Sequence, residues 1–447
     1  MLYRDFALVN IENKHQPYAV NKDLNGGLGT VDRLEGGILL SIVSKYRKRN
    51  FKLPVLTLVH LQSILISRDF TTEYFESALP DEAEYQFKAI VIYASMVDYP
   101  FELECAKKLK RTFEKARIGF VGPFVAQRPH IFEEYDFWVT GEAEYYFLHQ
   151  FKSFSDLKGR LAALKPIDMN ELPAPDLSGF NSSHYAYSNI LKRPFFTWQA
   201  SRGCPYSCSY YCTYGAYQGK KMRVRAPAKV VSDLKLLQEK YMINSVLFRD
   251  PVFGLQKNFV ELFCRELIKQ GVQIEWAIET RLDLLDKQKL FLMKENGLRC
   301  INVGIETFND KVAKRNHRNT ASHQRQVELV SYCRELGVEV NALYVIGLIS
   351  DTRKTIQETI EYSILLDTDR ARFSVCTPYP GTALYDELQR HGSIFESDLT
   401  RYNQFSPVFK HDNLSSDEIL KLLNLSYRRF YIRFKILKRL FKRLITL

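Results

Sequence analysis

The sequence lacks any apolar run long enough to span a bilayer, and its first residues, MLYRDFALVNIENK, lack the apolar core of a secretion signal. We therefore expect a cytoplasmic protein, in which cysteine side chains stay reduced. Hydrophobic residues make up 46% of the chain and charged residues 26%, a composition typical of a globular protein with a large core. At 447 residues the chain is too long for one ordinary core, which predicts two or three domains.

Acidic residues are missing from the end of the chain. None follows Glu418, whereas eight Lys or Arg residues lie between Arg428 and Arg443 and supply two thirds of the net charge of +12. The rest of the chain is only mildly basic, so a general nucleic-acid-binding surface is not required and we expect no nucleic-acid partner. We expect a small-molecule substrate instead. Residues 425–447 have the pattern of a basic amphipathic helix. Two alternatives stay open for it: peripheral contact with an anionic membrane at its inner face, or docking on the protein body.

Apolar runs alternate with amphipathic stretches in the first third of the chain. The expected buried strands span residues 6–11, 53–60, 89–96, 117–125 and 136–144. Buried strands separated by helices predict a parallel sheet covered on both faces, which is a Rossmann-like domain over residues 1–155. Gly26, Gly27 and Gly29 follow the first strand, near the edge where such a sheet binds ligands.

The remainder of the chain divides into three parts. Residues 156–194 carry Pro166, Pro173 and Pro175 with little periodicity, which indicates a linker. A strand-plus-helix unit then recurs within residues 195–390, and its strands begin near Phe196, Asn244, Gln273, Arg299, Val338 and Ala371. This pattern predicts an α/β fold with a partial (β/α)6 TIM-like barrel, in which the chemistry lies where the strands end. Residues 391–447 form a C-terminal helical extension.

Three of the eight cysteines crowd into one short loop directly after the first barrel strand. The segment is SRGCPYSCSYYCTYG (201–215), and it contains Cys204, Cys208 and Cys212. No fourth Cys or His lies nearby to complete a closed zinc site. Three thiolates on one loop can hold an iron–sulfur cluster and leave one iron open to a small molecule. The alternative is three incidental buried thiols.

The segment SRGCPYSCSYYC resembles the cluster loop of radical S-adenosylmethionine (SAM) enzymes. Later segments resemble the strand ends of that family in the same order: SVLFRDPVFG, EWAIETRLDLL, INVGIETFNDKV, LYVIGLISDT and CTPYPGTALYDEL. The first domain is similar to the cobalamin-binding-type (B12-binding-like) domain that precedes such barrels in one subgroup, with its Gly-Glu signature at Gly141–Glu142. The usual spacing is C-x3-C-x2-C. The C-x3-C-x3-C spacing of this chain resembles a side branch that includes a diol dehydratase.

The resemblance implies a [4Fe–4S] cluster on Cys204, Cys208 and Cys212, with SAM bound to the open iron. Five other residues fall at the family's SAM-binding positions: Tyr211 and Gly347 beside adenine, Asp250 at the ammonium, Arg281 at the carboxylate and Glu306 at the ribose. Each has a structural alternative, such as barrel packing or an ion pair between Asp250 and Arg281. No residue is assigned as a catalytic acid or base.

Cobalamin binding stays open at this point. The chain lacks the D-x-H-x-x-G loop whose histidine ligates cobalt in some cobalamin proteins. His60 is a ligand candidate by position alone, and a lone histidine is more often structural. Several relatives bind cobalamin without that histidine, so its absence decides nothing.

The implied reaction is reductive cleavage of SAM to a 5′-deoxyadenosyl radical that abstracts hydrogen from an unactivated C–H bond. An electron donor such as flavodoxin or ferredoxin would supply the electron. We expect dehydration, deoxygenation or rearrangement of a sugar-like, amphiphilic or lipid-linked substrate. Two alternatives stay open: a cobalamin-dependent radical SAM methyltransferase, and a non-catalytic scaffold tethered to a membrane or RNA. The intact cysteine triad argues against the scaffold.

Overall fold

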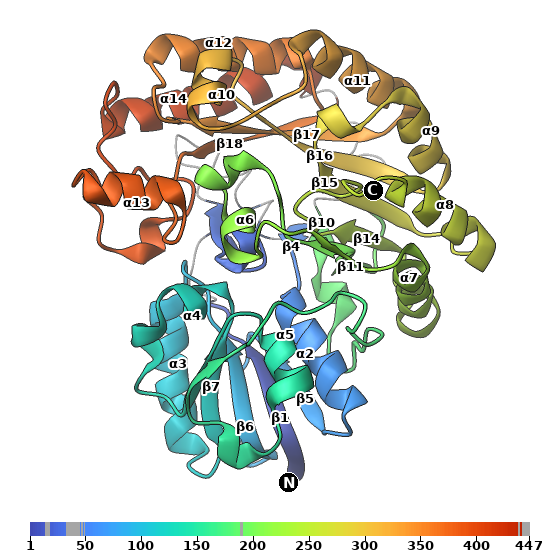
Figure 1. The fold of residues 1–447 in the computed structure, drawn as a ribbon, viewed down its shortest axis with the longest axis vertical. Coiled ribbons are helices and arrows are strands. Elements are labelled where there is room, and N and C mark those ends of the chain that lie inside the picture. Colours follow the sequence, from blue (N-terminus) through green and yellow to red (C-terminus); the bar gives the residue numbers. More distant parts are fainter. Residues whose placement is uncertain are drawn as a thin grey trace.

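A parallel-sheet domain and an open barrel pack against each other, and helix α6 (Thr213–Tyr217) lies between them (Figure 1). The structure is a computed structural model and describes residues 1–13, 18–32, 45, 48, 50–187, 191–436 and 439. In this part of the chain, no helix has the length and apolar character needed to cross a membrane.

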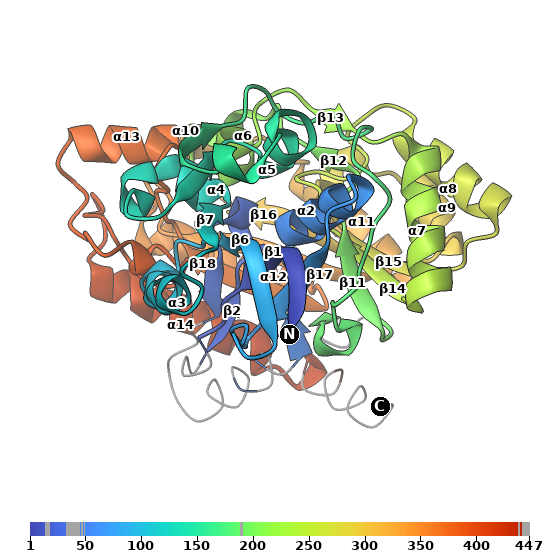
Figure 2. The same ribbon diagram turned by 90° about the horizontal axis from the view of Figure 1, so that it is seen from below.

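The N-terminal domain is a six-stranded parallel sheet with the order β5-β1-β6-β7-β8-β9. Its strands are β1 (Leu2–Asn10), β5 (Thr72–Glu76), β6 (Tyr85–Tyr93), β7 (Arg117–Val121), β8 (Phe137–Thr140) and β9 (Gly159–Ala162). Phe6 and Leu8 of β1 belong to the core on the side of α2 (Leu56–Ser67), whereas Ala7 and Val9 belong to the core on the side of α3 (Tyr99–Thr112). This alternation confirms a sheet with both faces covered, as Figures 1 and 2 show.

The predicted strand at 53–60 is wrong, because most of it belongs to helix α2. Leu58, Leu61 and Leu65 are fully buried, and so are their neighbours on the other sides of the helix, including His60. A helix that is apolar all round loses the 3.6-residue pattern, and a short apolar run then cannot be distinguished from a buried strand. Strands β5 and β9, at the two edges of the sheet, were not expected.

The second domain is a six-stranded parallel sheet whose strands follow chain order, β11-β14-β15-β16-β17-β18. The strands are β11 (Phe195–Trp198), β14 (Ser245–Phe248), β15 (Glu275–Thr280), β16 (Leu298–Glu306), β17 (Glu339–Ile346) and β18 (Arg370–Val375). Each begins within two residues of its predicted start, which confirms the partial barrel. The outer helices are α7 (Pro227–Tyr241), α8 (Phe259–Gln270), α9 (Lys287–Glu295), α11 (His323–Leu336), α12 (Arg353–Leu366) and α14 (Ser416–Tyr431).

Short elements connect and flank the two sheets. Three two-stranded pairs are β2 (Ala19–Asn21) with β3 (Thr30–Asp32), β4 (Phe51–Lys52) with β10 (Ala186–Tyr187), and β12 (Ser201–Arg202) with β13 (Arg223–Val224). The short helices are α4 (Pro123–Gln127), α5 (Ala143–Tyr145), α10 (Asp310–Arg315) and α13 (Ala383–Arg390).

The described part of the C-terminal extension docks on the barrel. The Tyr427 hydroxyl donates to the Phe373 carbonyl of β18 at 2.8 Å, and the Phe430 ring is fully buried. Beyond α14, the cations of Arg433, Lys435 and Arg439 gather around the Asp367 carboxylate. Of the basic amphipathic segment, residues 437–438 and 440–447 lie outside the described residues.

We expect Phe430→Ala to lower the free energy of unfolding by about 3–5 kcal/mol, because it removes a fully buried ring and leaves a cavity. Phe434→Ala is the matched control, since the Phe434 side chain is 83% exposed, and it should change the stability by less than about 0.5 kcal/mol. Urea and thermal unfolding of the two variants measure this. Equal losses would contradict the docked position of α14.

Candidate active site

The cysteine loop is held as a series of tight turns between β12 and α6. The Cys204 N–H donates to the Gly219 carbonyl at 3.0 Å, and Cys208 lies in a short 3-10 helix. The Cys212 N–H donates to the Cys208 carbonyl at 2.9 Å, and Cys212 caps the N-terminus of α6. The wider second interval thus forms one helical turn between two cysteines, because an i→i+4 bond spans four residues.

The three thiols lie just below the surface and influence one another. Cys204 and Cys208 are buried, and Cys212 is half-buried. Burial first, and then the neighbouring Cys208 thiol, raises the pKa of Cys212. Burial also raises the pKa of Cys204, which Arg281 and Arg318 oppose. Among the described residues, no three Cys, His, Asp or Glu side chains converge tightly enough to hold a metal ion.

Three soft sulfur donors on one loop, with two buried arginines to offset their charge, nevertheless fit an iron–sulfur cluster. The Arg318 Nη1 atom lies 3.8 Å from the Cys208 sulfur. A [4Fe–4S] cluster held by these three cysteines would keep one iron without a thiolate from this loop.

Glu306 occupies a strained position at the end of β16. Its φ angle is +68°, in the left-handed region that non-glycine residues avoid, and the β16–β17 register shifts at this point. A Cβ atom on Gly304 would collide with the Glu306 carboxylate, so glycine leaves the room that this side chain occupies. The carboxylate lies 3.7 Å from Arg318, and burial raises its pKa against the opposing effect of that arginine.

Asp250 and Arg281 do not pair with each other. The Asp250 carboxylate accepts from the Ala200 N–H at 2.8 Å and from the Ser201 hydroxyl at 2.6 Å. Burial raises its pKa to about 7. Arg281 forms two 2.9 Å bonds to Asp283, and its guanidinium lies 4.0 Å from the centre of the Tyr206 ring. Both side chains therefore brace the cysteine loop. Asp250 binds the residues that lead into the loop, and Arg281 stacks on Tyr206 within it.

The last two predicted residues lie on opposite sides of the same region. Tyr211 is half-buried, and its hydroxyl interacts with Glu306, Arg318 and the neighbouring thiols, which groups it with the cluster loop. Gly347 follows β17 with a φ of +76°. Its near neighbour is the Ile419 side chain of α14, 3.4 Å from where a Cβ would lie. The structure thus brings the cysteines, Tyr211, Arg281 and Glu306 together. Asp250 instead binds Ala200 and Ser201, which precede the cysteine loop, and Gly347 lies beside Ile419 of α14.

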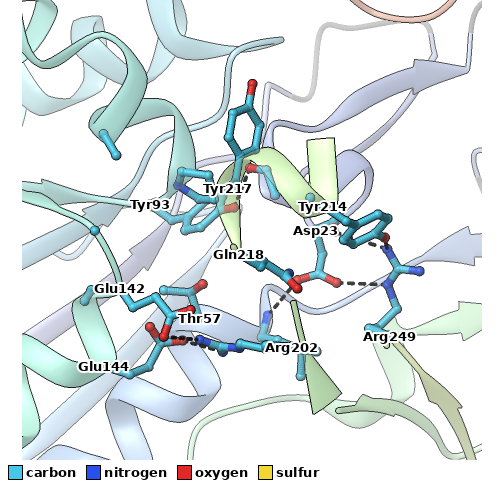
Figure 3. A pocket seen from close by; sticks show the side chains of 18 of the residues that line it. Asp23, Thr57, Tyr93, Glu142, Glu144, Arg202, Tyr214, Tyr217, Gln218 and Arg249 are labelled. Atoms are coloured by element: carbon cyan, nitrogen blue, oxygen red, sulfur yellow. Dashed lines mark hydrogen bonds and ion pairs between the residues drawn. The ribbon is translucent and has the colours of Figure 1, made fainter. Parts of the chain in front are cut away.

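A pocket opens between this loop and the carboxyl edge of the N-terminal sheet (Figure 3). One wall consists of Gly27, Gly122 and Gly141, which lie in the turns at that edge. The opposite wall consists of Tyr214, Tyr217 and Gln218 from α6 and of residues that precede the cysteines. Two clusters of charged side chains border the pocket and connect its walls.

The first cluster joins the Gly-Glu signature to the cysteine loop. The buried Arg202, two residues before Cys204, donates to Glu144 at 2.7 Å and lies 3.7 Å from Glu142. Arg223 donates to both oxygens of Glu142, at 2.8 and 2.6 Å. The carboxylates come from the end of β8 and the arginines from the β12–β13 pair, so this cluster fixes the cysteine loop relative to the first domain.

The second cluster joins the turn after β2 to the barrel interior. Arg249, only 3% exposed, lies 3.1 Å from the Asp23 carboxylate and also binds Glu279. The Tyr214 hydroxyl accepts from Arg249 at 3.2 Å and donates to Glu279 at 3.3 Å. Burial raises the pKa of Asp23 although Arg249 opposes it. One arginine thereby connects the first domain, two barrel strands and helix α6.

Sequence analysis missed the arginines Arg202, Arg249 and Arg318. Arg202 and Arg249 lie inside segments that carried a prediction, and Arg318 follows such a segment by six residues. A basic residue in or near a motif is too common to be informative by itself. His60, the candidate cobalt ligand, does not line the pocket. Its ring packs 5.1 Å from that of Trp198 inside the core. Burial lowers its pKa well below the usual value.

Comparison with known proteins identifies the barrel. Residues 198–363 match the Radical SAM superfamily. The chain contains a radical SAM domain. This domain implies the [4Fe–4S] cluster and SAM as cofactors, and the matched range includes the three cysteines together with Tyr211, Asp250, Arg281, Glu306 and Gly347.

Several proteins of known name or structure are similar to this chain. An uncharacterized methyltransferase of Pyrococcus horikoshii is 27% identical over 353 residues, 74% of this chain and 76% of the relative. The anaerobic magnesium-protoporphyrin IX monomethyl ester cyclase of Cereibacter sphaeroides is 30% identical over 266 residues, 58% of this chain and 42% of the cyclase. This chain thus spans less than half of that relative. A structure of the radical SAM methyltransferase TsrM from Kitasatospora setae, with cobalamin and a [4Fe–4S] cluster bound, has a TM-score of 0.64, 15% identity and coverage of 96% and 85%. That likeness shows a shared two-domain fold.

We expect replacement of Cys204, Cys208 or Cys212 by alanine to abolish the bound cluster, because two thiolates cannot hold a cubane that needs three. Iron content and visible absorption after anaerobic reconstitution measure this. Cys105→Ala is the matched control, since Cys105 lies in α3 of the first domain, and it should keep the cluster. A triad variant with full iron content would contradict the assignment.

Proposed function

We propose that this radical SAM enzyme is a cobalamin-dependent methyltransferase. The observation that carries the proposal is the pocket between the carboxyl edge of the N-terminal sheet and the cysteine loop. Open parallel sheets bind ligands at that edge, and this edge directly faces the loop that holds the cluster. A carrier bound to the first domain would therefore lie next to the site of SAM cleavage.

The pocket walls fit cobalamin in their chemistry. Tyr93, Tyr214 and Tyr217 offer aromatic faces to a flat macrocycle, and three glutamines offer amide groups to its amide-bearing rim: Gln127, Gln199 and Gln218. The enclosed volume is about 110 Å³, below the ~300–1,000 Å³ of typical ligand pockets. A macrocycle would therefore extend through the open side of the pocket. Among the described lining residues there is no histidine, so we assign no protein ligand to cobalt.

The side chains of the two walls would have different functions in the reaction. When bound, the cluster supplies the electron for SAM cleavage, and cobalamin supplies a methyl carrier. The half-buried Glu306 and the buried Arg318, 3.7 Å apart beside Cys208, can hold polar groups of SAM. Arg281 and Asp250 keep the cysteine loop in place, and Arg202 keeps it against the first domain.

The comparisons favour methyl transfer over the dehydration, deoxygenation or rearrangement that we expected first. Methyltransferases occur among the similar proteins at broad coverage, as in the Pyrococcus relative. A hopanoid C-2 methylase of Rhodopseudomonas palustris is 27% identical over 256 residues. The cyclases match over a smaller share of their own length, so we keep hydrogen abstraction without methylation as the second candidate.

The experiment tests cofactor binding and turnover separately. We expect the anaerobically reconstituted enzyme to bind hydroxocobalamin and, with SAM and dithionite, to form 5′-deoxyadenosine and S-adenosylhomocysteine. Ala126→Trp places a large ring in the pocket wall and should abolish corrinoid binding while the iron content stays unchanged. Visible spectra after gel filtration and product analysis by liquid chromatography measure both.

Ala228→Trp on the exposed start of α7 is the matched control and should bind corrinoid normally. Corrinoid-free enzyme that still forms 5′-deoxyadenosine would favour the second candidate. Loss of 5′-deoxyadenosine formation in fully loaded wild-type enzyme would sink both.

We also propose that the C-terminal region touches an anionic membrane and so admits a lipid-linked or amphiphilic substrate. Support comes from Phe434, Ile432 and Leu365, which are 83%, 51% and 66% exposed near the cations of the docked segment. We expect the double variant I432E/F434E to lose flotation with phosphatidylglycerol vesicles. Leu164→Glu, an equally exposed site on the first domain, should float as the wild type does. Equal flotation of all three would remove the membrane role.

A further inference from the structure

Two segments without acidic residues meet at the cysteine loop: the first contains the loop, and the second packs against it. Residues 201–232 contain six Lys or Arg residues and no Asp or Glu, and residues 311–327 contain five and none. The two segments are far apart in the chain. Arg202, Arg223 and Arg225 are paired with Glu144, Glu142 and Asp233, so the lysines of these segments carry the positive potential that attracts anionic partners.

Both segments touch the loop directly. The Gly219 carbonyl, next to Lys220, accepts the Cys204 N–H at 3.0 Å, and a Cβ on Gly203 would collide with the Lys221 carbonyl. On the other side, the Ser207 hydroxyl donates to the His317 carbonyl at 2.9 Å. Helices α6 and α10 and strand β13 all reach the same side of the molecule, at the top of Figure 2.

The loop itself is thin on this side. Pro205 and Ser207 are exposed, and they lie between Cys204 and Cys208 in the chain. Exposed residues of the loop thus lie next in the chain to buried cysteines. Because electron transfer between proteins weakens steeply with distance, a partner that docks on this loop would lie near the cluster site.

The charges on this face are available to a partner. Lys220, Lys221, Lys311 and Lys314 are exposed and form no ion pair with any described residue. Arg315 differs, because it binds Glu387 at 2.8 Å. The exposed Asp310 at the start of α10 lies 3.9 Å from the His323 ring nitrogen.

We propose that Lys220, Lys221, Lys311 and Lys314 form the docking surface for an acidic electron-donor protein. The proposal rests on the proposed radical SAM chemistry and names the partner of that same site. A reduced flavin or iron–sulfur protein would be oxidised by one electron, and the cluster held by the three cysteines would be reduced by one. Transient electron-transfer contacts are small, so opposite charges set their association rate and make it sensitive to salt.

The test compares two reductants on the reconstituted holoenzyme. The probe is an acidic flavodoxin kept reduced by its reductase, and the readout is 5′-deoxyadenosine formed from SAM per minute. We expect the variant K220E/K221E/K311E/K314E to lose about tenfold or more of the flavodoxin-driven rate at low salt. With dithionite, which needs no docking, its rate should stay within about twofold of the wild type. Added NaCl should lower the wild-type rate of 5′-deoxyadenosine formation when flavodoxin is the reductant, and should leave the rate with dithionite unchanged.

The control K107E/K115E reverses two exposed lysines on and after α3, remote from the loop, and should leave both rates unchanged. A quadruple variant with the full flavodoxin-driven rate would overturn the docking surface. So would a variant slowed equally with both reductants, because the lysines would then serve the chemistry or the fold. If the wild type forms no 5′-deoxyadenosine even with dithionite, the proposed function fails and not the docking surface alone.

Discussion

Two buried arginines, Arg202 and Arg249, join the N-terminal domain to the barrel beside the pocket. Their carboxylate partners are Glu144 in the short helix α5 and Asp23 in the turn after β2, whereas the arginines follow the first two barrel strands. Removing one partner of a buried pair leaves an unpaired charge and typically costs about 3–5 kcal/mol. The contact between the two domains therefore depends on both members of each ion pair.

This arrangement places two chemistries on facing walls. The cysteine loop, braced by Asp250 and Arg281, borders the barrel side, and Tyr93 at the end of β6 and the glycine turns after β7 and β8 border the sheet side. Neither wall belongs to one domain's hydrophobic core. Each is a set of loops positioned by strand ends, which is where parallel sheets of both kinds place their ligands.

Most of the fold followed from periodicity in the sequence. The six barrel strands begin near the predicted residues because each is a short apolar run between two amphipathic helices. Helix α2 was mistaken for a strand because the barrel covers the side of it that would otherwise be polar. The cysteines stood out because their spacing is rare. The bracing role of Asp250 could not be predicted, because its partners are the backbone N–H of Ala200 and the hydroxyl of Ser201, some fifty positions earlier, and nothing in the sequence connects them.

Charge pairs between the domains were equally hidden. Glu142 was marked by its place after Gly141, but nothing in the sequence connects it with Arg223, 81 positions later. Such a pair depends on the final packing of two units that are each predictable alone. The strained Glu306 belongs to the same class, since its backbone angle arises from the bulge at the end of β16.

The turn between Cys208 and Cys212 has a consequence for how such proteins are found. A bond from the backbone of one cysteine to the other makes the interval a property of a helical turn and not of a loop of free length. A pattern search that demands two residues between these cysteines would pass over this chain. A search that allows one full turn, and requires an aromatic residue before the last cysteine, would recover chains built in this way.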